Sequence, residues 1–239
     1  NAAGPAHLAY VAKKAGVKRF IYADSCSVYG FTGDVVSTEE SPAKSMYPYG
    51  ISKLQGELAV RELADETFSV ICLRQGTVCG FSPRMRFDLV LNTMYKTAVT
   101  EGVVRVDNPD IWRPVLALSD AILAYEKAIL ADHSVSGIFN VSSGNFSVGE
   151  LGERAVSTLK VLGIQARLET GQQKSFRNYR VSTEKAARIL GCSFSGSPES
   201  IIKEIHAQVG TTYDFEDDAH YNIRMFKKLL GSHPYSLTV

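Results

Sequence analysis

Three short apolar runs constrain the fold more than any other feature of this chain. They cover residues 17–23, 68–73 and 138–141. Each run is short and rich in β-branched or aromatic residues, which is typical of strands buried on both faces of a parallel sheet. Residues 50–64 lie between the first two runs and place Ile51, Leu54 and Leu58 at helical spacing. This order predicts an α/β fold built on a doubly wound parallel sheet.

The remaining sequence alternates predicted helices and short strands. We expect helices over residues 5–15, 87–100, 120–130, 147–162, 183–191, 198–208 and 221–230, and short strands over 103–106 and 167–169. Ser119 is predicted to cap the helix that follows it, and Ser147 with Glu150 forms a capping-box pattern. The segment between Gly30 and Tyr47 contains Gly, Ser and Pro, so we expect a surface loop there.

Composition excludes several classes of protein. The chain has 239 residues, and its 26 basic and 25 acidic residues nearly cancel, so we expect neither a nucleic-acid partner nor a membrane-surface partner. No apolar run approaches the roughly 18 residues of a membrane span. The four cysteines lack metal-site spacing, and we interpret them as reduced, buried thiols in a cytoplasmic protein without a metal centre.

Tyr49 and Lys53 stand four residues apart near the start of the second predicted helix. Residues at this spacing project from one helical face. A phenol is a poor acid or base at neutral pH, and a neighbouring ammonium group lowers its pKa. The pair could therefore transfer a proton at an alcohol or ketone carbon. A bare Tyr-x-x-x-Lys pattern is more often only a helix start, so its context decides.

Polar residues follow the first two strand-like runs. Residues 24–30 end the first run and residues 74–80 end the second. The carboxyl ends of strands in an open α/β sheet are where ligands bind. Both segments are therefore candidate walls of a binding site.

The ordered set of these segments resembles the extended short-chain dehydrogenase/reductase family, which includes nucleotide-sugar epimerases and dehydratases. Ser25, three residues before Val28-Tyr29-Gly30, stands where the family keeps a catalytic hydroxyl, and Tyr49 with Lys53 matches its YxxxK motif. Residues 73–80 match its LRxxNVYG strand end, with Thr77 in place of Asn and Cys79 in place of Tyr. The resemblance extends from Asn1 to about Leu230.

This resemblance implies a division into two parts. Residues 1–80 and 112–145 would be the remainder of a dinucleotide-binding Rossmann domain. Residues 81–111 and 146–239 would form a smaller mixed α/β domain for the nucleotide sugar. The fold class that it implies is therefore the C-terminal part of a doubly wound Rossmann domain joined to a substrate domain.

The resemblance also assigns roles to the site residues. Tyr49 would exchange a proton with a sugar oxygen, Ser25 would hydrogen-bond the same oxygen, and Lys53 would lower the pKa of Tyr49 and bind the nicotinamide ribose. The cofactor-binding residues that it implies are Ala23, Ser25, Tyr49, Lys53, Gln75 and Gly76. The cofactor would be NAD, with NADP left open.

Arginines suggest the substrate, because a guanidinium pairs bidentately with phosphate and a nucleotide diphosphate needs such neutralisation. The family positions favour Arg113 and Arg177, and Thr77 can still offer a hydroxyl. Arg86 is a weaker candidate, since it could equally belong to a solvated basic turn. We interpret Asn92 as helical surface.

The family's dehydratases place Asp-Glu directly after the catalytic hydroxyl, whereas this chain has Cys26 and Ser27. Without that carboxylate pair, we reject dehydration. Cys26 could serve as a thiol acid or base, but a packed cysteine at a strand end is the simpler interpretation.

The family's glycine-rich loop, GxxGxxG, is absent, and only 28 residues precede Tyr29. We therefore expect the sequence to be a fragment that holds about half of a cofactor site and is not stably active alone. For the whole protein we expect a nucleotide-sugar epimerase, a homodimer by analogy. The alternatives are a 4-keto nucleotide-sugar reductase and a non-catalytic binding protein on the same fold.

Overall fold

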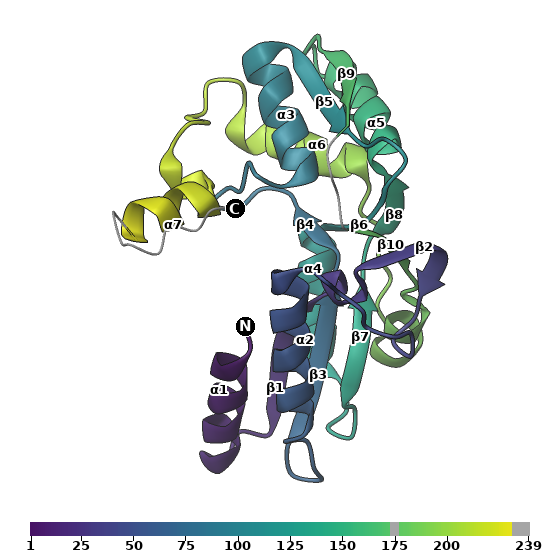
Figure 1. Ribbon diagram of the computed structural model, residues 1–239, viewed down its shortest axis with the longest axis vertical. Helices are drawn as coiled ribbons and strands as arrows, with labels where there is room; N and C mark the ends of the chain where they lie inside the picture. Colours follow the sequence, from purple (N-terminus) through teal and green to yellow (C-terminus); the bar gives the residue numbers. More distant parts are fainter. Residues whose placement is uncertain (173–176, 231–239) are drawn as a thin grey trace.

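The computed structural model describes residues 1–172 and 177–230 of the chain. Figure 1 shows a parallel sheet flanked by helices in its lower half and a smaller group of helices and strands above it. The expected α/β class is confirmed. None of the described helices is both long and apolar enough to cross a bilayer.

All three predicted apolar runs form strands of one parallel sheet in the order β1-β3-β7. These strands are β1 (Arg19–Ser25), β3 (Ser69–Gln75) and β7 (Gly137–Val141). The register places Ser25 beside Gln75 and Gln75 beside Val141. The three strands therefore end level with one another, and the segments that follow them share one edge of the sheet.

Successive residues of β3 pack against opposite layers of helices. Val70 and Cys72 join the cluster under α1 and α2, whereas Ile71 and Leu73 join the cluster under α4 and η2. The covering helices are α1 (Ala3–Lys14), α2 (Pro48–Arg61), α4 (Leu118–Leu130) and η2 (Ala186–Leu190). Burial on both faces explains why this run is continuously apolar.

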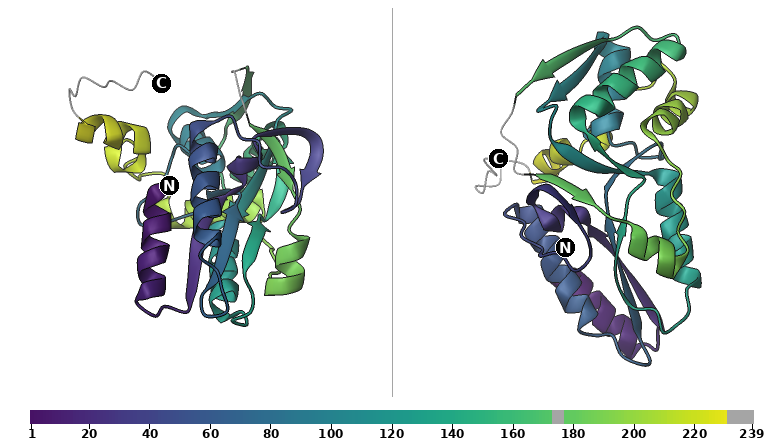
Figure 2. Two further views of the ribbon diagram at one scale, coloured as in Figure 1. Left: turned by 60° about the horizontal axis from the view of Figure 1, so that its bottom comes forward. Right: turned by 90° about the vertical axis from the view of Figure 1, so that its right-hand side faces the viewer.

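The upper part has its own apolar core, which includes the fully buried side chains of Met85, Leu91 and Leu151. Its elements are α3 (Val90–Glu101), β5 (Val103–Asp107), α5 (Val148–Val161), β9 (Arg167–Gly171), α6 (Pro198–Val209), η3 (Asp218–His220) and α7 (Asn222–Leu230). Strands β5 and β9 pair in parallel. Figure 2 shows these elements stacked at the end of the main sheet where its strands finish.

Two small sheets join the parts and were not predicted as strands. One contains β4 (Thr77–Cys79), β6 (Trp112–Ala117) and β8 (Gly144–Ser147), and the other contains β2 (Phe31–Ser37) and β10 (Asn178–Val181). The expected loop is present over residues 38–46, whereas residues 31–37 form β2, which pairs with a strand far along the chain. That pairing is long-range, so turn-forming residues alone did not reveal it.

Serine residues cap two helices where the sequence predicts helix starts, and one predicted cap is absent. Ser147 caps α5, where its side chain accepts from the Glu150 amide at 3.0 Å. Ser197 and Ser200 form a reciprocal cap on α6. The Ser119 prediction is wrong, since α4 begins at Leu118 and its N-cap is Ala117. All four cysteines are free and buried, as expected.

Candidate active site

The site lies at the level edge where β1 and β3 end. A cavity of about 710 Å³ opens there, and we refer to it as the strand-end pocket. Its lining residues are Ala23, Asp24, Ser25, Ser27, Tyr47, Tyr49, Lys53, Gln75, Gly76, Thr77, Val78, Arg86, Asp88, Leu89, Val90, Arg113, Arg177, Tyr179, Asn222 and Ile223. Every residue that the sequence nominated for catalysis, cofactor binding or substrate binding is among them.

Ser25 is the last residue of β1 and the N-cap of the short helix η1 (Cys26–Tyr29). Its hydroxyl oxygen accepts a hydrogen bond from the Ser27 amide at 3.2 Å. The hydroxyl proton remains available for donation, and a hydrogen bond from the Ser25 side chain lowers the pKa of Tyr49. A donor to the phenol oxygen favours the phenolate, so Ser25 opposes the effect of burial on Tyr49, and both residues line the strand-end pocket.

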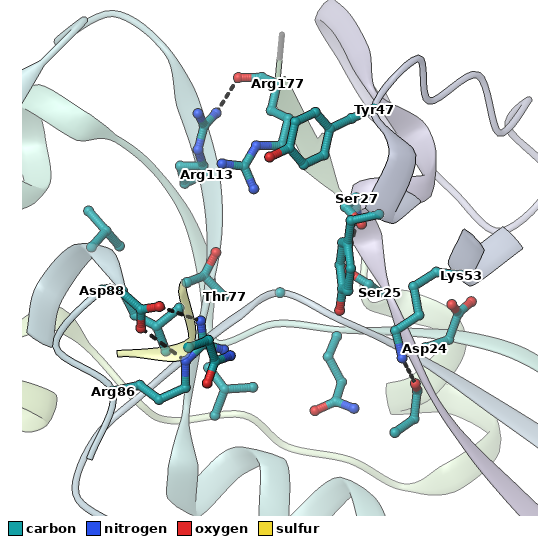
Figure 3. Close-up of a pocket in the computed structure, with 18 of the residues that line it drawn as sticks. Asp24, Ser25, Ser27, Tyr47, Lys53, Thr77, Arg86, Asp88, Arg113 and Arg177 are labelled. Atoms are coloured by element: carbon teal, nitrogen blue, oxygen red, sulfur yellow. Dashed lines mark hydrogen bonds and ion pairs between the residues drawn. The ribbon is translucent and has the colours of Figure 1, made fainter. Parts of the chain in front are cut away.

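Lys53 lies one turn after Tyr49 on α2. Its Nζ atom donates to the carbonyl oxygen of Ala23 at 2.6 Å and stands 5.8 Å from the centroid of the Tyr49 ring. Figure 3 shows the amine reaching back to the end of β1. Ser25, Tyr49 and Lys53 thus all line one pocket.

The electrostatics of Tyr49 differ from the sequence-based expectation. Tyr49 remains 43% exposed, yet partial burial raises its pKa and outweighs the lowering by Ser25, Arg86 and Arg177. Burial also lowers the pKa of Lys53. The expected lowering of the Tyr49 pKa by its lysine neighbour is therefore wrong here, since withdrawal from water disfavours both charged forms.

Three arginines, Arg86, Arg113 and Arg177, also line the strand-end pocket. Arg113 donates to the backbone oxygens of Trp112, at 2.9 Å, and of Arg177. Burial lowers the pKa of Arg113 to about 10, which shows that the pocket poorly solvates its positive charge. The Arg177 guanidinium lies 5.3 Å from the centroid of the Tyr47 ring, a stacking contact visible in Figure 3.

Arg86 is held by a carboxylate inside the pocket. Its Nε and Nη2 atoms bond to the two carboxylate oxygens of Asp88 at 3.0 and 2.9 Å. A phosphate bound at Arg86 would compete with this pairing. Asp88 is a lining residue that the sequence did not reveal.

Asn92 supports the segment that presents Arg86. It is buried, its side-chain oxygen accepts from the Gly80 amide at 3.2 Å, and its Nδ2 donates to the Arg86 carbonyl at 3.0 Å. The expectation that Asn92 is helical surface is therefore wrong. Its position on the inward face of α3 was the signal that could have placed it correctly.

Gln75, Gly76 and Thr77 form the floor where β3 passes into β4. The Gln75 side chain donates to the Tyr125 hydroxyl at 2.9 Å. A Cβ atom at Gly76 would lie 2.8 Å from the Pro114 carbonyl oxygen, so this glycine permits close packing of two chain segments. Thr77 sits beside Val115 of β6 and faces the pocket.

Cys26 takes no part in the pocket lining. Its side chain is completely buried and its thiol donates to the Arg74 carbonyl oxygen at 3.0 Å. Burial raises its pKa. The interpretation of Cys26 as a packed thiol is confirmed.

Comparisons with known proteins fit this geometry. Residues 1–142 match the sequence model of the NAD dependent epimerase/dehydratase family. The chain belongs to this family. The family is NAD-dependent, so NAD is its cofactor.

Curated relatives cover only part of the chain. Over 88 residues, the chain is 35% identical to UDP-glucose 4-epimerase of Bacillus subtilis. The match covers 36% of this chain and 26% of that protein. Over 85 residues, it is 34% identical to UDP-glucose 4-epimerase 2 of Arabidopsis thaliana. This match covers 35% of this chain and 24% of that protein. The matched region thus spans about a quarter of these relatives' length.

Solved structures share the fold over most of the chain. UDP-glucuronic acid 4-epimerase from Bacillus cereus, in complex with UDP-glucuronic acid and NAD, has a TM-score of 0.74 and 20% identity, covering 87% of this chain and 67% of that one. The Bordetella bronchiseptica enzyme WbmG, in complex with NAD and UDP, has a TM-score of 0.72 and 24% identity, covering 90% and 67%. The Rossmann-type fold is therefore that of the family.

The residues present fit the nicotinamide ribose end of the family's cofactor. Lys53 carries a three-donor ammonium group and uses the Ala23 carbonyl as one acceptor. Further donation could go to a diol placed beside Tyr49. The glycine-rich motif GxxGxxG, which binds the pyrophosphate in the family, does not occur in this sequence.

Proposed function

We propose that the whole protein is an NAD-dependent epimerase that acts on a nucleotide-diphosphate sugar through a transient keto intermediate. The observation that carries this proposal is that Ser25, Tyr49 and Lys53 line the same strand-end pocket, with the Lys53 amine 5.8 Å from the centroid of the Tyr49 ring. The names of the curated relatives, which are UDP-sugar 4-epimerases, support the same activity.

Each polar group has a task at the sugar. Tyr49 removes the proton of a sugar hydroxyl and later returns it to the keto oxygen. Ser25 donates a hydrogen bond to the same oxygen, and Lys53 orients the ribose. NAD, when bound, supplies the hydride acceptor and returns the hydride.

The arginine wall accounts for the diphosphate. Arg86 and Arg113 lie on the side of the pocket away from Lys53, and Arg177 lies against Tyr47. A diphosphate would offer Arg113 a charge-assisted, bidentate acceptor. Thr77 adds a hydroxyl donor on the floor.

Two other activities use the same pocket. A 4-keto nucleotide-sugar reductase needs the same Ser25, Tyr49 and Lys53 but consumes one reduced cofactor, NADH or NADPH, per turnover. A non-catalytic binding protein would need none of them. We exclude dehydration from the proposal because Ser27, rather than a carboxylate, lines the pocket after Cys26.

The proposal extends to organisation. We assign residues 1–80 and 112–145 to the cofactor-binding part and residues 81–111 and 146–239 to the substrate part, and we propose a cytoplasmic homodimer. The separate core of the upper elements supports the division, although η2, within residues 146–239, packs against the main sheet. Sedimentation of the full-length protein at the mass of one chain would contradict the dimer.

The decisive experiment incubates full-length protein with NAD and a panel of UDP-, dTDP- and GDP-sugars and separates the products. We expect one sugar to be converted to its epimer with no net change in cofactor absorbance. Stoichiometric loss of NADH or NADPH with a keto sugar would support the reductase instead. Unchanged cellular function in Tyr49→Phe, with no conversion in the panel, would support the binding protein.

A further inference from the structure

A buried cluster of charges lies behind Lys53 and contains two carboxyl groups but one buried arginine. Glu57 engages Arg74 through Nε–Oε2 and Nη2–Oε1 bonds of 2.6 and 2.9 Å. Arg74 also donates to the Tyr29 hydroxyl at 2.8 Å. The donors of this arginine that point toward the carboxyl groups are thus used by Glu57.

Asp24 is the second carboxyl group, and it accepts no hydrogen bond from Arg74. Its side chain is fully buried, and its nearest ion-pair contact is the Arg74 Nε atom at 3.7 Å. Within residues 1–172 and 177–230, neither of its carboxyl oxygens has a hydrogen-bond partner. Asp24 nevertheless lines the strand-end pocket and directly precedes Ser25. Figure 3 shows it on the Lys53 side of the pocket.

We propose that Asp24 is a positioning residue that acts by its charge on Tyr49 and Lys53. In the neutral state it carries a proton, and loss of that proton to solvent hydroxide places a negative charge behind both side chains. The negative charge of Asp24 makes phenolate formation at Tyr49 less favourable above the pH at which Asp24 ionises. It concerns the regulation of the proposed site and therefore rests on the proposed role of Tyr49.

The surroundings of Asp24 give the direction of each effect. Burial first, and then the neighbouring Glu57 side chain, raise the pKa of Asp24 to about 9, whereas Arg74 lowers it. The Asp24 charge in turn raises the pKa of Tyr49 and of Lys53. Like charges disfavour one another, and an acid beside an amine favours the ammonium form.

Other titratable groups also face Asp24. They are Tyr22 of its own strand, Cys26 of η1, Tyr49, Lys53 and Glu57 of α2, and Cys72 and Arg74 of β3. The pKa values of Tyr22, Cys26 and Cys72 are all raised, chiefly by burial. Tyr49 and Lys53 are therefore the members of this set that face the pocket and can report the charge of Asp24.

The test titrates Tyr49 in full-length protein without any substrate. Ultraviolet difference spectra between the parent and Tyr49→Phe give the midpoint of Tyr49 ionisation, and the same pair is made on an Asp24→Asn background. The Asn variant keeps the shape of Asp24 but never becomes an anion. We expect the phenol's acid dissociation constant to rise by ~3- to 10-fold in Asp24→Asn. Asp110→Asn, which removes an exposed carboxylate outside the pocket, should leave it unchanged.

A second readout is the pH dependence of acetic anhydride labelling at Lys53, measured by mass spectrometry. Its midpoint should fall in Asp24→Asn. If this variant does not fold, Asp24→Ser is measured in the same way. Unchanged midpoints at both Tyr49 and Lys53 would overturn the proposal. Neither readout requires turnover, so a failed search for an epimerase substrate leaves this result separate.

Discussion

The Glu57 carboxylate grips the Arg74 guanidinium at 2.6 and 2.9 Å, and both side chains are almost completely buried. The pair joins α2 to the C-terminal end of β3, and Glu57 lies one helical turn after Lys53. It therefore sets the distance between α2 and the sheet on which Ser25 sits.

Removing one partner of this pair should destabilise the protein strongly. We expect Glu57→Gln to lower the free energy of unfolding by ~3 kcal/mol, because the arginine charge would remain buried without its counter-charge. Urea unfolding followed by circular dichroism measures the change. Glu62→Gln at the exposed end of the same helix should cost less than ~0.5 kcal/mol. Equal losses in the two variants would contradict the structural role of the pair.

Stability should also depend on the protonation of Asp24. Its folded-state pKa of about 9 is above its ordinary value near 3.8, so the folded state holds a proton that the unfolded state has released over this range. The contribution of Asp24 is most favourable below pH 4 and becomes less favourable as pH rises toward 9. We therefore expect Asp24→Asn to gain more than ~1 kcal/mol relative to the parent between pH 5 and pH 8. A difference in unfolding free energy that stays constant with pH would contradict this.

Gly50 fixes the contact between α2 and η1. A Cβ atom there would lie 2.6 Å from the Ser27 carbonyl oxygen and 2.2 Å from the Ser45 hydroxyl. We expect Gly50→Ala to destabilise the protein by ~1–3 kcal/mol, since the backbone of η1 must move. Gly4→Ala on α1 has open space and should be neutral or stabilising by up to ~1 kcal/mol. Thermal unfolding of the two variants gives the comparison, and a stabilised Gly50→Ala would count against the described packing.

Arg113 should carry much of the binding of a diphosphate. We expect Arg113→Met to weaken binding of UDP to full-length protein by ~10- to 100-fold in calorimetry, because a charge-assisted, bidentate contact is lost. Arg113→Lys should recover only part of this, since an ammonium group lacks the planar fork. Arg84→Met alters an arginine outside the pocket lining and serves as the control. Similar weakening in the Arg84 and Arg113 variants would argue against a phosphate site at Arg113.

Asn92 should matter for stability although it bears no charge. Replacing it with Ala leaves the buried Gly80 amide and Arg86 carbonyl without their partner. We expect a loss of ~1–3 kcal/mol in unfolding free energy. Thr100→Ala at the exposed end of α3 should stay within ~0.5 kcal/mol. A neutral Asn92→Ala would show that the segment carrying Arg86 does not depend on it.

The sequence by itself predicted the strands of the parallel sheet, and its resemblance to the family nominated Ser25, Tyr49 and Lys53 as catalytic residues. Continuous apolar runs indicate strands whose two faces are both covered by helices. The spacing of Tyr49 and Lys53 is a local property of one helix. The strand β2, by contrast, required a partner from residues 178–181, and no local pattern contains that information. The inward position of Asn92 likewise came from packing against the chain segment before α3.

Tertiary structure alone decided the electrostatics of the site. A tyrosine and a lysine four residues apart suggest a lowered phenol pKa, yet burial raises it, because desolvation depends on what surrounds the pair rather than on their spacing. Asp24 shows the same limit. Its position next to Ser25 is visible in the sequence. That two buried carboxyl groups share one buried arginine becomes visible only when α2 and β3 bring Glu57 and Arg74 together beside it.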